Sequence, residues 1–303
     1  MSIKIGISPI AWQNDDLPEL TADFTMEQAL RESREIGYTG IERGRRMPQD
    51  TQGLRIYLEQ FDLALCGGWC SGNLLQNSVE EEIAAIRDQV NQFVQLNAPC
   101  IVYAECSNTV QGQLNTPVSQ RPRFSKHDVM AYARKLGEVA KWTADQGLAL
   151  SYHHHMGSIV EDQDDVDALM QGSSKELNLL FDTGHLHFAG ASVLDTLDRW
   201  GDRVQHVHFK DVRADVLETI KHNDSSFLES VVAGAFTVPG DKDGCIDFQA
   251  VANKLKQIDY SGWIVVEAEQ DPAKAPPYEN SKLGYEHIIS VCESSGLLIN
   301  TEK

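Results

Sequence analysis

Short apolar runs alternate with longer amphipathic segments along the whole chain. The apolar runs lie at residues 3–7, 38–42, 63–69, 100–104, 148–152, 177–181, 204–209 and 262–268. Between them apolar residues recur at helical spacing, which predicts helices at 25–36, 54–61, 125–146, 164–170, 192–200 and 248–258, one beginning at Ser78, and a last one that includes 285–292. Strict alternation of strand and helix favours parallel strands, because each crossover returns the chain to the same end of the sheet.

Polar residues mark where several of these helices begin. Thr25 is followed by Gln28 three residues later, a spacing typical of a capping box. Ser78 precedes three glutamates, which the positive end of a helix dipole favours. Gly37 can end the first helix.

Eight strand–helix units over 303 residues predict an α/β fold, a (β/α)8 TIM barrel, rather than a doubly wound open sheet. No G-x-G-x-x-G pattern follows the first strand, which argues against a dinucleotide-binding fold. No linker or low-complexity tract separates two halves, so we expect one TIM-barrel domain over residues 1–303. Residues 213–240 are longer than a usual βα connection and predict a helical insertion, with a helical pattern near 215–232. This insertion could serve as a lid or as a contact in a homo-oligomer.

Composition narrows the class of partner. The chain is 42% hydrophobic and 23% charged, as in ordinary globular proteins, and its formal net charge is -19. Carboxylates spread over the chain disfavour binding to nucleic acid and to anionic membranes, and favour a small-molecule partner. No signal peptide or bilayer-length apolar run is visible, and the six cysteines lack a disulfide-framework spacing, so we expect a cytoplasmic protein with reduced thiols.

Titratable residues gather where the predicted strands end, which is where TIM barrels carry their active sites. They are Glu42, Glu105, His153, His155, Asp182, His185, His208, Lys210, Glu267 and Glu269. Carboxylate and imidazole groups together suit a hard or borderline divalent cation. Four successive strand ends supply candidate metal ligands: His153, Asp182, His208 and Glu267. Alternation along a strand puts His155 on the same face as His153, so either histidine could be the fifth-strand ligand.

Local motifs make a family resemblance specific. FDTGH at 181–185, HVHFKD at 206–211, VPG at 238–240 and VE at 266–267 resemble the xylose-isomerase-like TIM barrels. GISPIAW at 6–12, GGW at 67–69, YHHHMG at 152–157 and WIVVEAEQDP at 263–272 resemble the inosose dehydratases within that superfamily. The resemblance spans essentially the full length. It departs at the fifth strand, where most superfamily members have a glutamate and this chain has His153.

The resemblance implies a function. Inosose dehydratases are metal-dependent hydro-lyases of myo-inositol catabolism, which convert 2-keto-myo-inositol (scyllo-inosose) to a trihydroxycyclohexane-1,2-dione. The family is described as using Mn²⁺ or Co²⁺, with glutathione as a further cofactor. The superfamily's four ligands fall on the same four residues, His153, Asp182, His208 and Glu267. The main alternative on this barrel is a metal-dependent ketose or sugar isomerase or epimerase.

Dehydration of a polyhydroxylated cyclic ketone requires a base for the proton beside the carbonyl and an acid for the departing hydroxyl. The available groups are His185, Lys210, Glu267 and His155, and we expect His185 or Lys210 to move protons, with Glu267 as ligand and base. Aromatic faces pack against the C–H surface of a sugar ring, and charged groups bind its hydroxyls. Residues expected to contact the substrate are Trp12, Glu42, Trp69 and Arg213.

Overall fold

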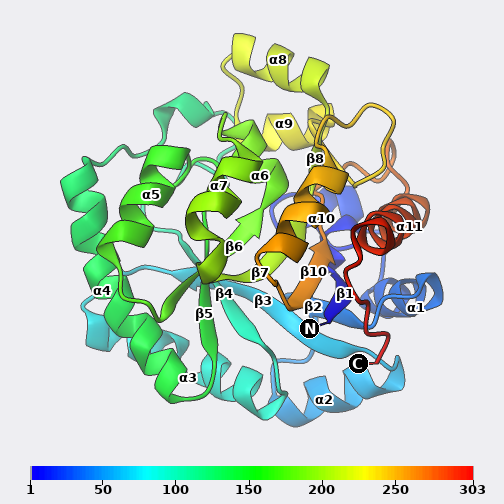
Figure 1. Cartoon of the computed structure of the whole chain (residues 1–303), viewed down its shortest axis with the longest axis horizontal. Coiled ribbons are helices and arrows are strands. Elements are labelled where there is room, and N and C mark those ends of the chain that lie inside the picture. The colour runs from blue at the N-terminus through cyan, green and yellow to red at the C-terminus, as the bar shows by residue number, and fades with distance from the viewer. Residues whose placement is uncertain (1, 303) are drawn as a thin grey trace.

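The computed structural model describes residues 2–302 and contains a closed barrel of parallel strands (Figure 1). Around the barrel the order is β1-β10-β7-β6-β5-β4-β3-β2, so each strand pairs with its sequence neighbours and β10 closes on β1. The barrel strands are β1 (Ile3–Ile7), β2 (Gly40–Arg43), β3 (Ala64–Gly72), β4 (Cys100–Glu105), β5 (Ala149–His153), β6 (Leu177–Asp182), β7 (Val204–Phe209) and β10 (Gly262–Val266). The predicted TIM barrel is confirmed.

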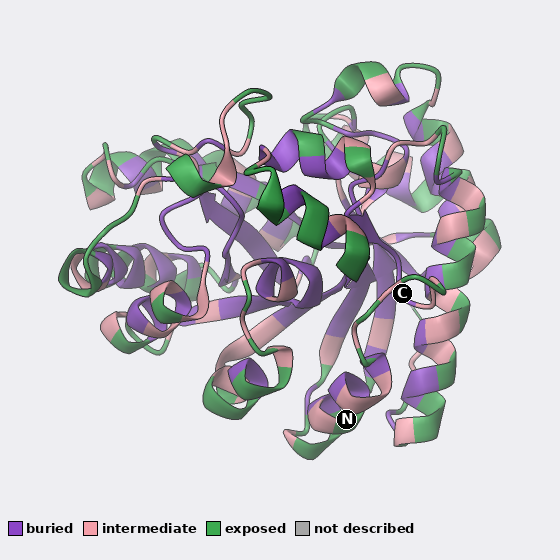
Figure 2. Ribbon diagram, turned by 90° about the horizontal axis from the view of Figure 1, so that it is seen from above, coloured by how far each residue is buried: buried purple, intermediate pink, exposed green. Residues whose placement is uncertain are grey.

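Helices connect successive strands and cover the outside of the barrel. They are α1 (Met26–Ile36), α2 (Thr51–Gln60), α3 (Val79–Gln95), α4 (Lys126–Asp145), α5 (Gln163–Gly172), α6 (Thr183–Phe188), α7 (Val193–Trp200), α8 (Ala214–His222), α9 (Phe227–Ala233), α10 (Phe248–Gln257) and α11 (Pro277–Ser295). Figure 2 shows buried residues on the strands and on the inner faces of these helices, and exposed residues on the outside. Among residues 2–302, no helix has both the length and the apolarity that a bilayer crossing requires.

Side chains set the helix starts where the sequence indicates. Thr25 Oγ1 accepts a hydrogen bond from the backbone N–H of Gln28 at 3.1 Å. Ser78 forms a full capping box with Glu81, and Ser125 caps α4 through the N–H of Asp128. These caps satisfy backbone donors that an isolated helix end leaves unpaired.

The barrel interior is apolar at the bottom and polar at the top. The indole ring of Trp263 fills the bottom of the barrel. A Cβ on Gly40 of β2 would lie 2.4 Å from this ring, so only glycine fits at position 40. Trp263 and Val265 form a small buried cluster with Cys66. Since side chains alternate along a strand, the same inward row continues to Glu267 at the mouth.

The segment after β7 forms an insertion of two helices and a small hairpin. Strands β8 (Asp211–Val212) and β9 (Phe236–Thr237) pair antiparallel, with α8 and α9 between them. The helical pattern expected near 215–232 forms two helices, because the chain turns at Asp224, which has a φ of 51°. The insertion has its own apolar cluster, which includes Phe227, Phe236 and residues of the barrel loops.

Candidate metal centre and active site

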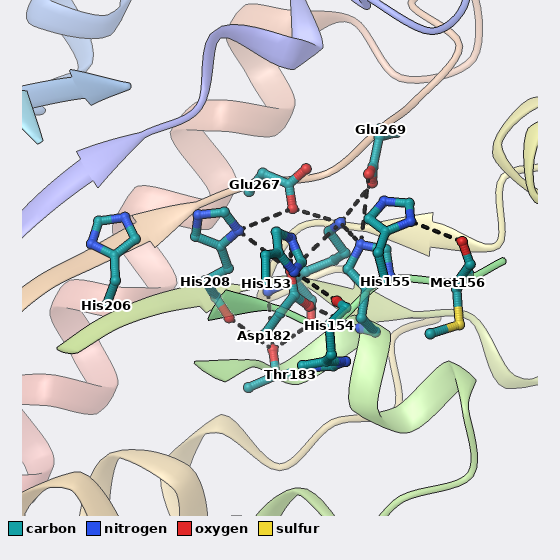
Figure 3. A network of polar contacts seen from close by, with 12 residues as sticks. His153, His154, His155, Met156, Asp182, Thr183, His206, His208, Glu267 and Glu269 are labelled. Atoms are coloured by element: carbon teal, nitrogen blue, oxygen red, sulfur yellow. Dashed lines mark hydrogen bonds and ion pairs between the residues drawn. The ribbon is translucent and has the colours of Figure 1, made fainter. Parts of the chain in front are cut away.

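Four side chains converge at the C-terminal mouth of the barrel, one from each of four neighbouring strand ends (Figure 3). His208 Nδ1 lies 3.4 Å from Asp182 Oδ2 and 3.6 Å from Glu267 Oε2. His153 Nε2 lies 3.9 Å from the same Asp182 oxygen. All four residues are buried. The structure therefore brings together the four expected ligands, and their role as ligands stays a prediction.

The free atoms of this group suit a divalent cation. Among the described residues, Asp182 Oδ2, Glu267 Oε2 and His208 Nδ1 are buried and have no hydrogen-bond partner, although they face one another. Burial and the neighbouring Glu269 raise the pKa of Glu267, because negative charge accumulates there. Burial opposes ionisation of His208, but Glu42, Asp182 and Glu267 outweigh it and raise its pKa. A proton thus sits where a metal ion would supply the missing positive charge.

Hydrogen bonds distinguish the two fifth-strand histidines. His153 Nδ1 donates to the carbonyl of His154 at 2.7 Å, which leaves Nε2 free beside Asp182. His155 Nδ1 donates to the carbonyl of Met156 at 2.9 Å, and this imidazole lies beside His185 and Glu269 instead. Burial and His185 lower the pKa of His153 and of His155, so both rings are neutral. The geometry favours His153 over His155 as the fifth-strand ligand.

The Asp-Thr-Gly-His motif after β6 builds the surroundings of Lys210. Asp182 Oδ1 accepts the N–H of His185 and caps α6, so its other oxygen points into the mouth. Thr183 Oγ1 donates to the carbonyl of Lys210 at 2.6 Å and lies 3.0 Å from its N–H. A Cβ on Gly184 would lie 2.5 Å from Lys210 Cγ, so the glycine makes room for the lysine stem.

Glu42, on β2, lines the mouth and contacts two histidines of β7. Its Oε1 accepts hydrogen bonds from His206 Nε2 at 3.0 Å and from His208 Nε2 at 3.1 Å. Burial would raise the pKa of Glu42, but His208 and His206 outweigh it and hold the pKa well below its usual range. Cys100 and Glu42 raise the pKa of His206 to about 9 against the effect of burial. Glu42 therefore fixes the ring of His208 with Nδ1 toward Asp182.

A cavity of about 200 Å³ opens above these residues, a volume that suits a small molecule. Its walls come from the loops after several strands. They include Gln13, Asp15, Asp16, Glu42, Arg43, Arg45, Trp69, Ser71, Gln111, His153, His155, His208, Glu267 and Glu269. Trp69, 37% exposed, is thus placed where a ring could pack on it. His185 and Lys210 are fully buried beneath this lining, so neither reaches the cavity directly.

Two of the residues expected to contact the substrate, Trp12 and Arg213, are not part of the cavity lining. Trp12 is fully buried and donates its indole N–H to Glu32 on α1, so the ring packs at the end of the barrel. Arg213 lies 2.5 Å from the carboxylate of Asp241 and donates to backbone carbonyls of Gly234 and Phe236. It holds the insertion together rather than facing the cavity.

The insertion supplies aromatic rings that pack against the buried histidines and Lys210, a role that the sequence pattern does not reveal. The Phe227 ring centroid lies 4.8 Å from that of His155, and Phe236 lies 5.5 Å from His185. The ammonium of Lys210 lies 5.1 Å from the Phe236 ring. The unusual length of residues 213–240 is the only sequence signal of this role. The position of Glu269, which forms an ion pair with Lys210, could be predicted from the sequence, because residues two apart along a strand lie on the same face and Glu267 is one of them.

Comparison with known proteins places the chain in a family. Residues 30–291 match the model of the xylose isomerase-like TIM barrel family. The chain is 41% identical to the rhizopine catabolism protein MocC of Rhizobium meliloti, covering 99% of this chain and 92% of that protein. It is 38% identical to the inosose dehydratase of Geobacillus thermodenitrificans, covering 96% and 97%. The chain belongs to the inosose dehydratase family of xylose isomerase-like TIM barrels.

Solved structures agree on the fold. The IolI protein, crystallised with a zinc atom, matches with a TM-score of 0.69 and 16% identity, covering 97% of this chain and 99% of that one. At that identity the match establishes the shared barrel. The family membership rests on the full-length relatives.

Proposed function

We propose that this protein is a metal-dependent hydro-lyase that dehydrates 2-keto-myo-inositol to a trihydroxycyclohexane-1,2-dione in myo-inositol catabolism. The observation that carries the proposal is the convergence of Asp182 Oδ2, His208 Nδ1 and Glu267 Oε2, none of which has a hydrogen-bond partner, beneath a small cavity, in a chain whose full-length relatives include several inosose dehydratases. The six cysteines are unpaired, which supports a reducing, cytoplasmic location.

Asp182, His208, Glu267 and His153 would hold the ion, which we propose to be Mn²⁺ or Co²⁺. Bound there, a divalent cation supplies a Lewis acid for negative charge that develops on the ketone oxygen. We also propose that the protein binds glutathione, the further cofactor described for the family, at this cavity. Arg43 and Arg45 offer positive charge at the cavity for its carboxylates.

His155 is the residue best placed to move protons. It lines the cavity, its Nδ1 proton is held by the Met156 carbonyl, and its Nε2 is left as an acceptor. We propose that Nε2 takes the proton from the carbon beside the ketone and returns it to the hydroxyl that leaves the next carbon as water. The carboxylate of Glu269 faces this imidazole and would stabilise its charged form. His185 and Lys210 would act through Glu269 rather than on the substrate.

The test combines an assay with one variant. Metal-reconstituted protein incubated with 2-keto-myo-inositol should release one water and form the dione, which is followed by its absorbance. A different hexose-like product without loss of water would indicate an isomerase or epimerase.

His155→Gln should lower turnover by about 10²- to 10⁴-fold, the usual contribution of a general acid–base, while bound metal is retained. His187→Gln is the matched control. This half-buried imidazole on α6 contacts Cys245 and lies away from the cavity lining, so near-normal turnover is expected. Normal turnover of the His155 variant would refute this assignment.

A further inference from the structure

The ammonium group of Lys210 lies among groups that commonly bind metals. Its Nζ lies 2.5 Å from Glu267 Oε2 and 2.8 Å from Glu269 Oε2. It lies 2.8 Å from His185 Nε2 and 3.6 Å from Asp182 Oδ2. Among residues 2–302, neither Glu267 Oε2 nor Glu269 Oε2 accepts a hydrogen bond of acceptable geometry. The contacts of these two oxygens with Lys210 are therefore ion pairs.

Two of these groups, His185 and Glu269, form with His155 a donor set separate from the four proposed ligands. His155, His185 and Glu269 each offer one atom within 4.8 Å of the others, and all three are buried. Lysine has only protons to donate, so His185 must present the lone pair of Nε2 to the ammonium. Lys210 thus engages the lone pair of His185 and a carboxylate oxygen of Glu269, which a cation would otherwise bind.

The charges balance with one divalent ion and one ammonium. Asp182, Glu267 and Glu269 bring three negative charges to the mouth, while Glu42 is paired separately with two imidazoles. A divalent ion and Lys210 bring three positive charges. A second divalent ion beside Lys210 would set five positive charges against three negative ones, a much larger buried imbalance than the four against three that result when the ion takes the place of the lysine.

The lysine is also fixed in place. Thr183 contacts both its N–H and its carbonyl, Gly184 leaves space for its stem, and Phe236 covers its end. The side chain is fully buried, so the ammonium cannot move into water without displacing these neighbours.

We propose that Lys210 fills a second cation position, formed by His155, His185 and Glu269, and thereby keeps the centre mononuclear. The inference rests on the proposed metal site. It predicts that a neutral side chain of similar length at this position converts the centre to a two-metal one.

The test counts bound ions. Wild-type protein, Lys210→Met and Lys210→Arg are loaded with excess Mn²⁺, dialysed, and measured by elemental analysis and electron paramagnetic resonance. One ion per chain is expected for the wild type and for the arginine variant, which keeps the charge. Two ions per chain, with a spin-coupled spectrum, are expected for Lys210→Met. Adding His185→Ala to Lys210→Met should return the count to one.

Each outcome is decisive. One ion in Lys210→Met, or two in the wild type, overturns the inference and leaves the proposed metal site standing. No ion in the wild type overturns the proposed metal site itself. If Lys210→Met does not fold, Lys210→Gln, a second neutral side chain at this position, replaces it with the same expectation of two ions per chain, and one ion in that variant overturns the inference.

Discussion

A single carboxylate orients the histidine that faces the proposed metal. Glu42 on β2 accepts hydrogen bonds from both His206 and His208 on β7, and the two strands are not neighbours in the barrel. Groups that orient a ligand from behind fix its tautomer and raise its basicity. The free Nδ1 of His208 is therefore a consequence of Glu42.

Glu42→Gln should lower metal affinity about 10- to 100-fold, because a glutamine offers one oxygen and no charge to the two imidazoles. Competition with a chromophoric chelator measures this affinity. Glu105→Gln, which removes another buried strand-end carboxylate outside the metal group, is the control. Unchanged affinity in the Glu42 variant would show that His208 does not need this partner.

The loop between β5 and α5 carries His155 and is held by a buried ion cluster. Arg121, 1% exposed at its side chain, contacts Asp162 at 2.8 Å, Asp165 at 2.7 Å and Glu161 at 3.4 Å. Glu161 also accepts the N–H of Gly157 at 2.7 Å. Burial outweighs Arg121 and raises the pKa of Glu161 to about 7.

This cluster predicts a pH dependence of stability. Because the folded protein binds the Glu161 proton more tightly than the unfolded chain, its stability should fall as pH rises from about 4.5 to about 7, and level off above that. Glu161→Gln keeps the acceptor for Gly157 and cannot ionise. The difference in free energy of unfolding between this variant and the wild type should increase, in favour of the variant, by on the order of 3 kcal/mol as pH rises across this window. This figure follows from about 1.36 kcal/mol per pKa unit. Urea unfolding at several pH values measures the difference.

The control is Glu59→Gln, which removes a carboxylate from the exposed surface of α2. A constant difference between wild type and Glu161→Gln from pH 4.5 to 8 would contradict the expectation.

Elements were predictable from the sequence where periodicity is local. The inward row Trp263, Val265, Glu267 alternates along β10 and continues past its end, so both the strand and the ligand position follow from one pattern. Helix α6 was missed because it begins directly at the end of β6, capped by Asp182 itself. The position of Glu42 at a strand end was predictable, but its contact with His208 was not, since the two residues are 166 positions apart in the sequence.

At the scale of the whole molecule, we expect a bound metal ion to stabilise the folded protein, because three carboxylates lie close together in one buried place. Without a divalent ion, Asp182, Glu267 and Glu269 share the ammonium of Lys210 and the protonated imidazole of His208. A ligand that binds only the folded state stabilises it by mass action, by about 2.7 kcal/mol at 100 times its Kd.

Adding Mn²⁺ to chelator-treated protein should therefore raise Tm, as measured by differential scanning calorimetry. Asp182→Asn is the matched variant, because asparagine can still cap α6 but lacks the charge. The gain in Tm should be largely lost in that variant. An equal gain in both proteins would mean that the ion stabilises the chain at another place.

The contact from β2 to β7 spans the inside of the barrel, three strands apart through β1 and β10. During refolding, His208 can acquire its orienting partner only once the ring of strands has closed. The ion would then bind late in refolding, and the rate of its binding would measure how fast the barrel closes. Circular dichroism, which follows the formation of helices and strands, does not distinguish this step.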